Sequence, residues 1–315
     1  YMQLYMAPLE GITGYIYRNA YYKCYGDIDR YFAPFIMSKK LNQKEIRDIL
    51  PENNQGMELV PQILTNRAED FLAIAKAIHS YGYHVVNLNL GCPSPTVTSR
   101  NRGAGFLELT RELDRFLEDI FAACPMKISI KTRIGVEDEE EWPLLLKIYE
   151  KYPLEELIVH PRLKTDQYKP GTIHREAFEM AAEKSCHSLC YNGDITSVSD
   201  YDELLQQFPE TDKIMLGRGI LRKPWLPSEI KNGEKKDPQQ YKEKLKEFHE
   251  ELLNGYVDYM SGDKNTLYKM KELWAYLGTS FTNPEKYLKK IRKAQRVSEY
   301  KIWADNLFRE QELIL

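Results

Sequence analysis

VVNLNLGCP, residues 85–93, decides the fold: it is a short apolar run that ends in a Gly-Cys-Pro turn. Such runs are typical of buried strands in a parallel sheet. Similar runs alternate along the chain with amphipathic stretches, a pattern that indicates repeated βα units. Eight strands are expected, at Leu4–Leu9, Tyr31–Met37, Glu58–Leu64, Val85–Gly91, Lys127–Thr132, Glu156–His160, Ser188–Asn192 and Lys213–Gly217.

Eight strands close a (β/α)₈ barrel, and the run from Leu4 to about Gly233 has the ~200–250 residues that such a barrel needs. Beyond a polar segment at 231–240 the strand-like runs stop. We therefore predict an α/β fold, with a TIM barrel at 1–235 followed by a small all-helical domain at 236–315. Helices are expected at Asn66–Tyr81, with Asn66 and Glu69 in a capping box, and at Leu109–Cys124, Ile173–Ser185, Tyr241–Met260, Leu267–Leu277 and Glu285–Phe308.

Charge and cysteine content narrow the class of protein. The 315 residues carry a net charge of −3, which argues against a protein that coats nucleic acid indiscriminately. Five cysteines without the density of a disulfide framework favour a reducing, cytoplasmic location. Cys186 and Cys190 resemble half of a metal site, but no second pair follows at ligand spacing, so no metal is expected.

No membrane association is expected either. The longest stretch without Lys, Arg, Asp or Glu is Ala77–Ser99, which is too polar to span a membrane. No leader sequence is visible. Because the chain begins at Tyr1 rather than Met, we expect that residues before Tyr1 have been trimmed.

Polar residues follow nearly every predicted strand, at the end where (β/α)₈ barrels build their active sites. Taken singly, each has an ordinary structural explanation, such as pairing with a core carboxylate or satisfying loop backbone. Their joint occurrence at one end favours a functional site. They are Glu10, Gln62, Asn89, Cys92, Lys131, Arg133, His160, Arg162, Asn192-Gly193-Asp194 and Gly217-Arg218-Gly219.

The last two of these segments predict a phosphate site. Loops after strands seven and eight of such barrels commonly hold a phosphate through glycine N–H groups and a helix N-terminus. Gln62, Lys131 and His160 suit the hydrogen-bonding edge of a flat ring, where a lysine stabilises negative charge on a reduced isoalloxazine. FMN fits both halves, whereas no G-x-G-x-x-G follows a strand to support a Rossmann site.

Cys92 is the most informative cysteine, because it lies on the turn that leaves the fourth strand. A thiol of unperturbed pKa ~8.5 is mostly protonated at neutral pH, so it can act as a general acid as well as a nucleophile. The segment at 102–105, RGAG, follows it as a loop able to move over a substrate.

Together these residues resemble the tRNA-dihydrouridine synthase family. The motifs span the predicted barrel in order, and MKELWAYL at 270–277 is similar to a signature in the family's helical tail. The barrel motifs are Met6–Gly11, Asn89–Ser94, Lys131–Gly135, His160–Arg162 with Gln167–Gly171, Asn192–Ile195 and Gly217–Gly219.

The resemblance implies a flavoprotein that reduces the C5–C6 double bond of specific uridines in tRNA. It implies hydride transfer from reduced FMN to C6 of the uracil, protonation of C5 by Cys92, and NADPH as the reductant of the flavin. The expected cofactor contacts are Pro8, Leu9, Glu10, Gln62, Lys131, His160, Asn192, Gly193, Asp194, Gly217 and Arg218. The expected substrate contacts are Asn89, Arg133, Arg162, Lys271, Lys286 and Lys290.

Two motifs depart from the family's usual pattern. Thr96 stands where many members carry a lysine four residues after the catalytic cysteine. The segment His160–Leu163 reads HPRL where many members read HGRT, and a longer spacer follows it. Both departures concern loops that would contact the substrate.

The tail is expected to hold the tRNA. Residues 264–309 carry a net charge of +7 and the rest of the chain carries −10, with Lys286, Lys289, Lys290 and Lys293 at helical spacing. Basic helical faces are usually only solvated surface. Behind a barrel that resembles an RNA-modifying enzyme, this face is an expected RNA contact.

Two other functions stay open. An FMN barrel that acts on a free small molecule, like a dihydroorotate dehydrogenase or an ene-reductase, would explain the flavin motifs but not the basic tail. A non-catalytic tRNA-binding protein would explain the tail, although the intact Cys92, Lys131 and Arg218 argue against it. The expected partner is tRNA and the chain is expected to be monomeric; which uridine it reduces is not indicated.

Overall fold

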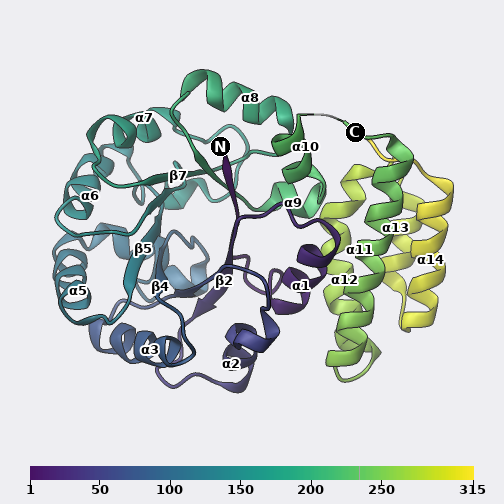
Figure 1. Ribbon diagram of the computed structural model, residues 1–315, viewed down its shortest axis with the longest axis horizontal. Coiled ribbons are helices and arrows are strands. Elements are labelled where there is room, and N and C mark those ends of the chain that lie inside the picture. The colour runs from purple at the N-terminus through teal and green to yellow at the C-terminus, as the bar shows by residue number, and fades with distance from the viewer. Residues whose placement is uncertain (234) are drawn as a thin grey trace.

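The computed structural model describes residues 1–233 and 235–315, and it confirms the predicted barrel. Eight parallel strands close in chain order, with β8 hydrogen-bonded back to β1. Helices surround this ring of strands (Figure 1). The strands are β1 Gln3–Met6, β2 Arg30–Ile36, β3 Leu59–Ile63, β4 Val85–Leu90, β5 Lys127–Thr132, β6 Leu157–Val159, β7 Leu189–Asn192 and β8 Lys213–Leu216.

The helices of the barrel fill the connections between strands. The predictions for α3, α5 and α7 are confirmed to within two residues. The helices are α1 Tyr15–Cys24, α2 Gln43–Ile49, α3 Ala68–Ser80, α4 Pro95–Thr98, α5 Thr110–Ala123, α6 Trp142–Tyr149, α7 Arg175–Lys184, α8 Val198–Gln207, α9 Arg218–Arg222 and α10 Leu226–Asn232.

The capping box predicted for α3 is wrong. The N-cap is Arg67, one residue later than the expected Asn66, and no side chain caps the helix. The Asn66 amide donates instead to the carbonyls of Arg100 and Asn101, at 3.0 and 3.2 Å. Glu69 forms an ion pair with Lys39 at 2.7 Å. Both side chains therefore bond to residues distant in sequence, so neither of them caps the helix.

Side chains fill the interior of the barrel beneath the carboxyl ends of the strands. Tyr5, Phe32, Ile158, Cys190 and Met215 form one buried cluster there. At the opposite end of the strands the Tyr5 hydroxyl donates to the Glu156 carboxylate at 2.8 Å. The barrel is therefore a closed core that supports a site at its mouth, as is usual for this fold.

The C-terminal part is helical, as predicted, and forms α11 Pro238–Tyr259, α12 Asp263–Leu277, α13 Glu285–Lys293 and α14 Val297–Glu310. The single helix predicted at Glu285–Phe308 is wrong, because the chain turns at the buried, extended Ala294 between α13 and α14. The carbonyl that this turn frees accepts a hydrogen bond from Lys271 Nζ at 2.7 Å. A tertiary contact thus satisfies the backbone where the helix breaks.

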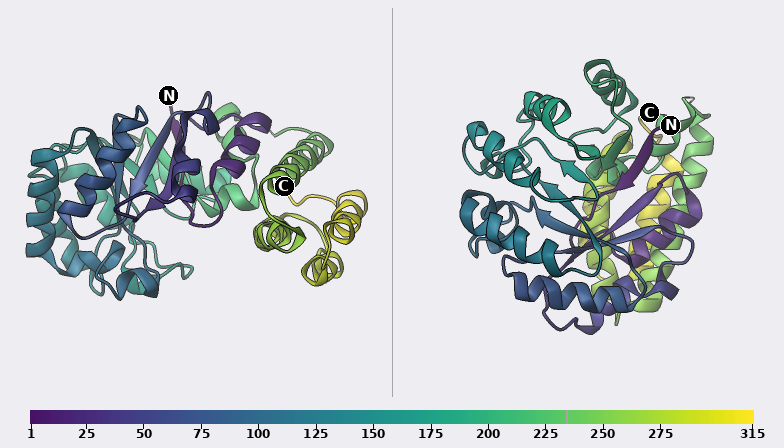
Figure 2. Two further views of the ribbon diagram at one scale, coloured as in Figure 1. Left: turned by 90° about the horizontal axis from the view of Figure 1, so that it is seen from below. Right: turned by 60° about the vertical axis from the view of Figure 1, so that its left-hand side comes forward.

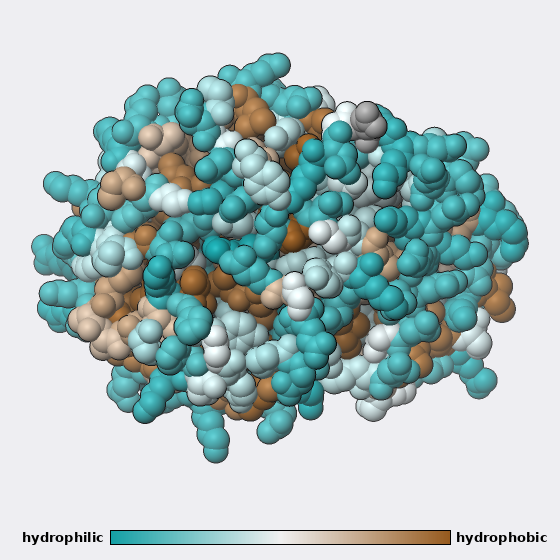
Figure 3. Space-filling view, in the orientation of Figure 1, coloured by the Kyte–Doolittle hydropathy of each residue, from teal (hydrophilic) through white to brown (hydrophobic). Residues whose placement is uncertain are grey.

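The tail packs beside the barrel, with α11 against α1 and α12 against α9 (Figure 2). Phe248 of α11 meets Tyr17, Tyr21 and Tyr25 edge to face, with ring centroids 5.4–6.0 Å apart. Gly255 permits this approach, because a Cβ there would lie 2.8 Å from the Ile16 side chain. Hydrophilic residues cover most of the visible face of the tail (Figure 3). Among the described residues, no helix is long and apolar enough to cross a membrane.

Candidate active site

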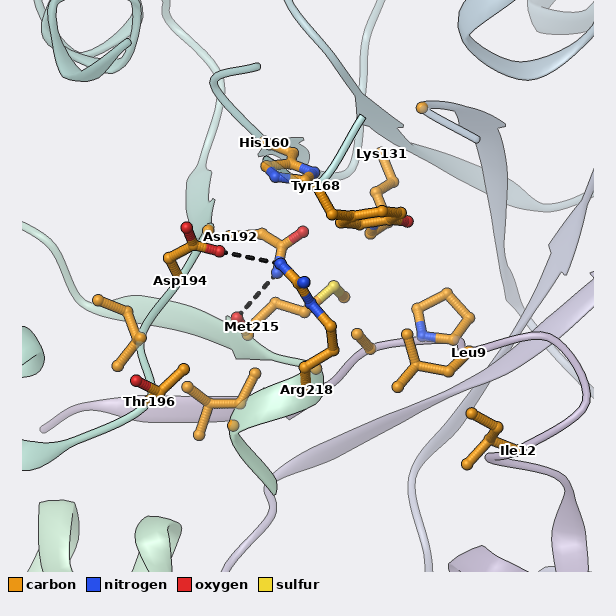
Figure 4. Close-up of a pocket in the computed structure, with 18 of the residues that line it drawn as sticks. Leu9, Ile12, Lys131, His160, Tyr168, Asn192, Asp194, Thr196, Met215 and Arg218 are labelled. Carbon is orange, nitrogen blue, oxygen red and sulfur yellow. Dashed lines mark hydrogen bonds and ion pairs between the residues drawn. The ribbon is translucent and has the colours of Figure 1, made fainter. Parts of the chain in front are cut away.

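A cavity of about 590 Å³ lies at the carboxyl ends of the strands (Figure 4). It brings together most of the residues predicted for the site, although they come from six strands spread over more than 200 residues. Those that line it are Pro8, Leu9, Glu10, Asn89, Cys92, Lys131, His160, Asn192, Gly193, Asp194, Gly217 and Arg218.

Asn89 shapes the turn that carries Cys92. Its Oδ1 accepts hydrogen bonds from the backbone N–H groups of Gly91 and Cys92, at 3.0 and 2.9 Å. Its Nδ2 donates to Gln62 Oε1 at 3.0 Å. Because both ends of the amide are engaged, Asn89 holds the cysteine turn on the barrel wall.

The loop after Cys92 packs tightly and does not have the freedom expected of it. Ala104 donates its backbone N–H to the Cys92 carbonyl at 3.0 Å, and Ala104 and Phe106 are buried. Gly103 has φ +56°, and a Cβ on it would lie 2.8 Å from that same carbonyl. The glycines therefore serve close packing behind the thiol.

Burial sets the protonation states at the mouth of the barrel. It raises the pKa of the Cys92 thiol, which stays protonated at neutral pH. It lowers the pKa of Lys131 to about 8, assisted by the charge of Arg133. It also lowers the pKa of His160 well below its usual range, so the imidazole is neutral. The site thus offers a protonated acid and a lysine close to its titration point.

Asp194 organises the loops after β6 and β7. Its carboxylate accepts from Arg162 at 2.9 and 2.7 Å and from Arg218 at 3.1 Å. Figure 4 shows Arg218 reaching across the cavity to this carboxylate. Asp194 has φ +53°, a conformation that Asp and Asn tolerate better than most residues. One carboxylate therefore holds two arginines, of which Arg162 is fully buried and Arg218 is partly exposed.

Arg162 is fully buried, unlike a residue exposed for RNA binding. Besides Asp194 it donates to the Lys169 carbonyl and to the Thr172 hydroxyl, each at 2.9 Å. Its Nη1 also lies 3.2 Å from His160 Nε2. Because guanidinium groups only donate, that imidazole nitrogen is the acceptor, which agrees with a neutral His160.

Tyr168 is a cavity residue to which the sequence analysis assigned no role. Two guanidinium groups contact its ring: that of Arg133 lies 5.0 Å from the ring centroid and that of Arg218 lies 4.6 Å from it. It is 46% exposed and projects toward Lys131 (Figure 4). A half-exposed aromatic ring held by cations is a surface on which a flat group can stack. The signal in the sequence was its place in Gln167–Gly171, a segment quoted only as a motif.

Other predicted residues lie away from the cavity. Gln62 is fully buried, and its amide is shared between Asn87 and Asn89. Arg133 is fully buried beneath Tyr168 and donates to the Leu163 carbonyl at 2.9 Å. Lys271 is partly buried and bonded to Ala294. Lys286 and Lys290 are exposed on α13, over the rings of Tyr287 and Trp303 respectively.

The cysteines considered for metal binding are separated. Cys190 lies inside the barrel, whereas Cys186 is exposed just before β7. Ligand atoms of Glu150, Cys186 and His187 do lie within 4.8 Å of one another. That group precedes β7, so it is at the opposite end of the barrel from the cavity, and His187 is already bonded to Glu150 at 2.8 Å.

Fold and cavity together define a barrel enzyme whose site combines a protonated thiol, a half-buried lysine and glycine-rich loops after the last two strands. The family model for dihydrouridine synthase matches residues 5–312. The chain belongs to this family, as the resemblance in the sequence had indicated.

Curated relatives extend over nearly the whole chain. A tRNA-dihydrouridine(16) synthase of Haemophilus influenzae is 25% identical, over 96% of this chain and 98% of its own length. One of Vibrio vulnificus, named in the same way, is 26% identical over 94% of both chains. A probable tRNA-dihydrouridine synthase of Helicobacter pylori is 27% identical, over 87% of this chain and 82% of its own.

Solved structures support the fold. Morphinone reductase superposes with a TM-score of 0.51 at 13% identity, over 76% of this chain and 88% of its own. An old yellow enzyme homologue from Zymomonas mobilis gives a TM-score of 0.52 at 12% identity, over 76% of this chain and 92% of its own. At such low identity these similarities concern the barrel architecture.

Proposed function

We propose that this protein is a tRNA-dihydrouridine synthase that uses FMN and is reduced by NADPH. The observation that carries the proposal is that Cys92, Asn89 and Lys131 line one cavity in a chain that matches the family over residues 5–312. The reaction adds a hydride to C6 and a proton to C5 of the uracil. A hydride donor, the flavin, and a proton donor must therefore both reach the same base.

The cavity fits FMN. Its 590 Å³ lies within the ~300–1,000 Å³ typical of cofactor sites. Lys131 has no hydrogen-bond or ion-pair partner among residues 1–233 and 235–315, so an unpaired cation faces the space. A Cβ on Gly193 would lie 2.9 Å from the Ile173 side chain, and one on Gly219 would lie 2.4 Å from a backbone carbonyl. Close packing of these loops therefore requires glycine at both positions, and both glycines line the cavity together with Arg218.

Bound there, FMN would supply the hydride. Lys131 would face the electron-rich edge of its ring, and Pro8, Leu9, Glu10 and His160 would border it. Asn192, Gly193, Asp194, Gly217 and Arg218 would hold the ribityl chain and the phosphate. Gln62 would act through Asn89, to which it is bonded at 3.0 Å.

Cys92 would give its proton to C5 of the uracil. Its raised pKa keeps the thiol in the form that donates. Asn89 would orient the thiol through the turn, and the base would stack on the exposed part of the Tyr168 ring, which Arg133 and Arg218 hold in place. We assign Arg162 to positioning the loop around Tyr168, because its guanidinium is fully buried and donates to Asp194 and to the Lys169 carbonyl of that loop.

We further propose that residues 1–235 are the catalytic domain and 236–315 the tRNA-binding domain. A uridine must leave its stack to reach the barrel mouth, at a cost of a few kcal/mol that other RNA contacts offset. Lys286 and Lys290 are exposed on α13, and Lys271 braces the junction behind them. One chain in the cytoplasm would suffice, since all these residues belong to it.

The test is to mix the reduced, FMN-loaded protein with tRNA and to follow oxidation of the flavin in a stopped-flow spectrometer. The tRNA comes from a strain that lacks the gene and is mapped for dihydrouridine before and after. We expect rapid oxidation and one new set of dihydrouridines. Rapid oxidation by free uracil, orotate or enones, with none by tRNA, would support a small-molecule oxidoreductase and refute the proposal.

A further inference from the structure

A second cavity, of about 470 Å³, lies beside the first, between the loop after β1, α2 and the end of α11. Glu10, Ile12 and Phe35 line both cavities. The two cavities therefore share part of their wall, so a polymer with one unit in the first cavity can place a neighbouring unit in the second.

The wall of this second cavity offers flat and apolar surface. Tyr259, at the end of α11, meets Tyr15 edge to face with ring centroids 5.8 Å apart. The Arg47 guanidinium lies 5.3 Å from the Tyr259 centroid. Tyr259 is 38% exposed and Met37 is 51% exposed. Exposed aromatic and guanidinium planes are the groups on which unstacked bases pack.

The charges of the lining favour an anion. Two of its three carboxylates already have partners within the protein. Asp48 forms an ion pair with Arg18, and Glu45 accepts hydrogen bonds from the backbone N–H groups of Asn42 and Met37. Lys44 and Arg47 are exposed, and the part of the chain that the structure describes offers neither of them an ion pair. With Asp48 neutralised by Arg18, the lining holds three cations, Lys44, Arg47 and Lys269, against the carboxylates of Glu10 and Glu45.

We propose that this second cavity binds the base of a nucleotide adjacent to the target uridine, with its phosphate facing Lys44 and Arg47. The inference rests on the proposed function. It adds a second base site, which would grip the RNA next to the reacting uridine and would make the neighbouring nucleotide part of the recognition.

The experiment couples a change in the pocket to a change in the RNA. Tyr259→Ala is compared with the wild type on the intact substrate tRNA and on two tRNAs that are abasic at the 5′ or the 3′ neighbour of the reduced uridine. Affinity is measured by filter binding, and the flavin oxidation rate is measured at saturating RNA. Tyr22→Ala, at a 40% exposed tyrosine of α1 that lines neither cavity, is the matched control.

We expect Tyr259→Ala and one of the abasic changes each to weaken binding about tenfold, as stacking on one aromatic ring implies. Combined, they should weaken it no further, because both remove the same contact. Tyr22→Ala should bind like the wild type. Oxidation at saturating tRNA should persist in every variant, which shows that the proposed function holds independently of the pocket.

Two results would overturn the second base site. Losses that multiply to about a hundredfold would show that Tyr259 and the neighbouring base act separately. A raised KM for NADPH in Tyr259→Ala, with tRNA affinity unchanged, would assign the pocket to the nicotinamide nucleotide instead. If no tRNA oxidises the reduced wild-type protein, it is the proposed function itself that fails.

Discussion

Replacing Arg162 by Ala should mainly lower the stability of the protein, rather than act directly on RNA binding. The guanidinium is fully buried and makes two bonds of 2.9 and 2.7 Å to Asp194. It also ties the Lys169 carbonyl and the Thr172 hydroxyl to the same centre. Removing one partner of a buried ion pair costs about 3–5 kcal/mol, because the other charge stays desolvated.

The 34% exposure of Asp194 places the expected loss at the lower end, about 3 kcal/mol, because water can reach the abandoned carboxylate. At roughly 2 °C per kcal/mol for a chain of this size, the midpoint of thermal unfolding should fall by about 6 °C. Circular dichroism and urea titration of the cofactor-free protein measure this loss. Arg100→Ala, at an exposed arginine of the same barrel, should change stability by less than ~0.5 kcal/mol.

Asp194→Asn tests the same pair from the other side. Asn tolerates the φ of +53° at this position, so the substitution removes the charge and keeps the backbone. It should lower stability by a similar amount and should also release Arg218. An Arg162→Ala protein that melts like the wild type but has lost its affinity for tRNA would refute this reasoning and make Arg162 an RNA contact.

Three further changes test other parts of the site. Cys92→Ala should keep reduction of the flavin by NADPH and slow oxidation by tRNA about 10²–10⁴-fold, the usual contribution of a positioned acid; equal loss of both half-reactions would make the cysteine structural. Because the pKa of Lys131 is lowered to about 8, its cation is lost as pH rises through that value, so FMN affinity measured by fluorescence quenching should fall about tenfold between pH 7 and 9. Lys131→Arg should flatten that profile, and an unchanged slope would show that another group titrates. Lys286→Glu with Lys290→Glu should reduce the dependence of tRNA affinity on salt, by up to about 2 in the log–log slope, while a slope identical to the wild type would remove α13 from the interface.

The barrel could be predicted because its strands are short apolar runs with local signals. Residues 85–90 are an example, since hydrophobic pattern and turn residues agree there. Hydrogen bonds between residues that are distant in sequence could not be predicted. Asn66 bonds to the backbone at 100–101 rather than to its own helix, and the carbonyl of Ala294 accepts from Lys271, 23 residues earlier, where one long helix was expected.

The roles of the arginines show the same limit at the site. Arg162 and Arg218 both follow strands and both bind Asp194, yet only Arg218 lines the cavity. From the sequence each is a cation at the end of a strand. The difference is in their other hydrogen bonds. The guanidinium of Arg162 also donates to the Lys169 carbonyl and to the Thr172 hydroxyl of a neighbouring loop, and that of Arg218 does not.

The packing of the tail determines how its role can be tested. Deleting it would expose Tyr17, Tyr21 and Tyr25, which now surround Phe248, and would remove Tyr276 from the wall of the active-site cavity. Exposing aromatic surface of this size destabilises a domain by several kcal/mol, so a truncated barrel would lose activity whether or not the tail binds RNA. Charge reversal on the exposed face of α13 leaves these contacts intact, and it therefore separates RNA binding from folding.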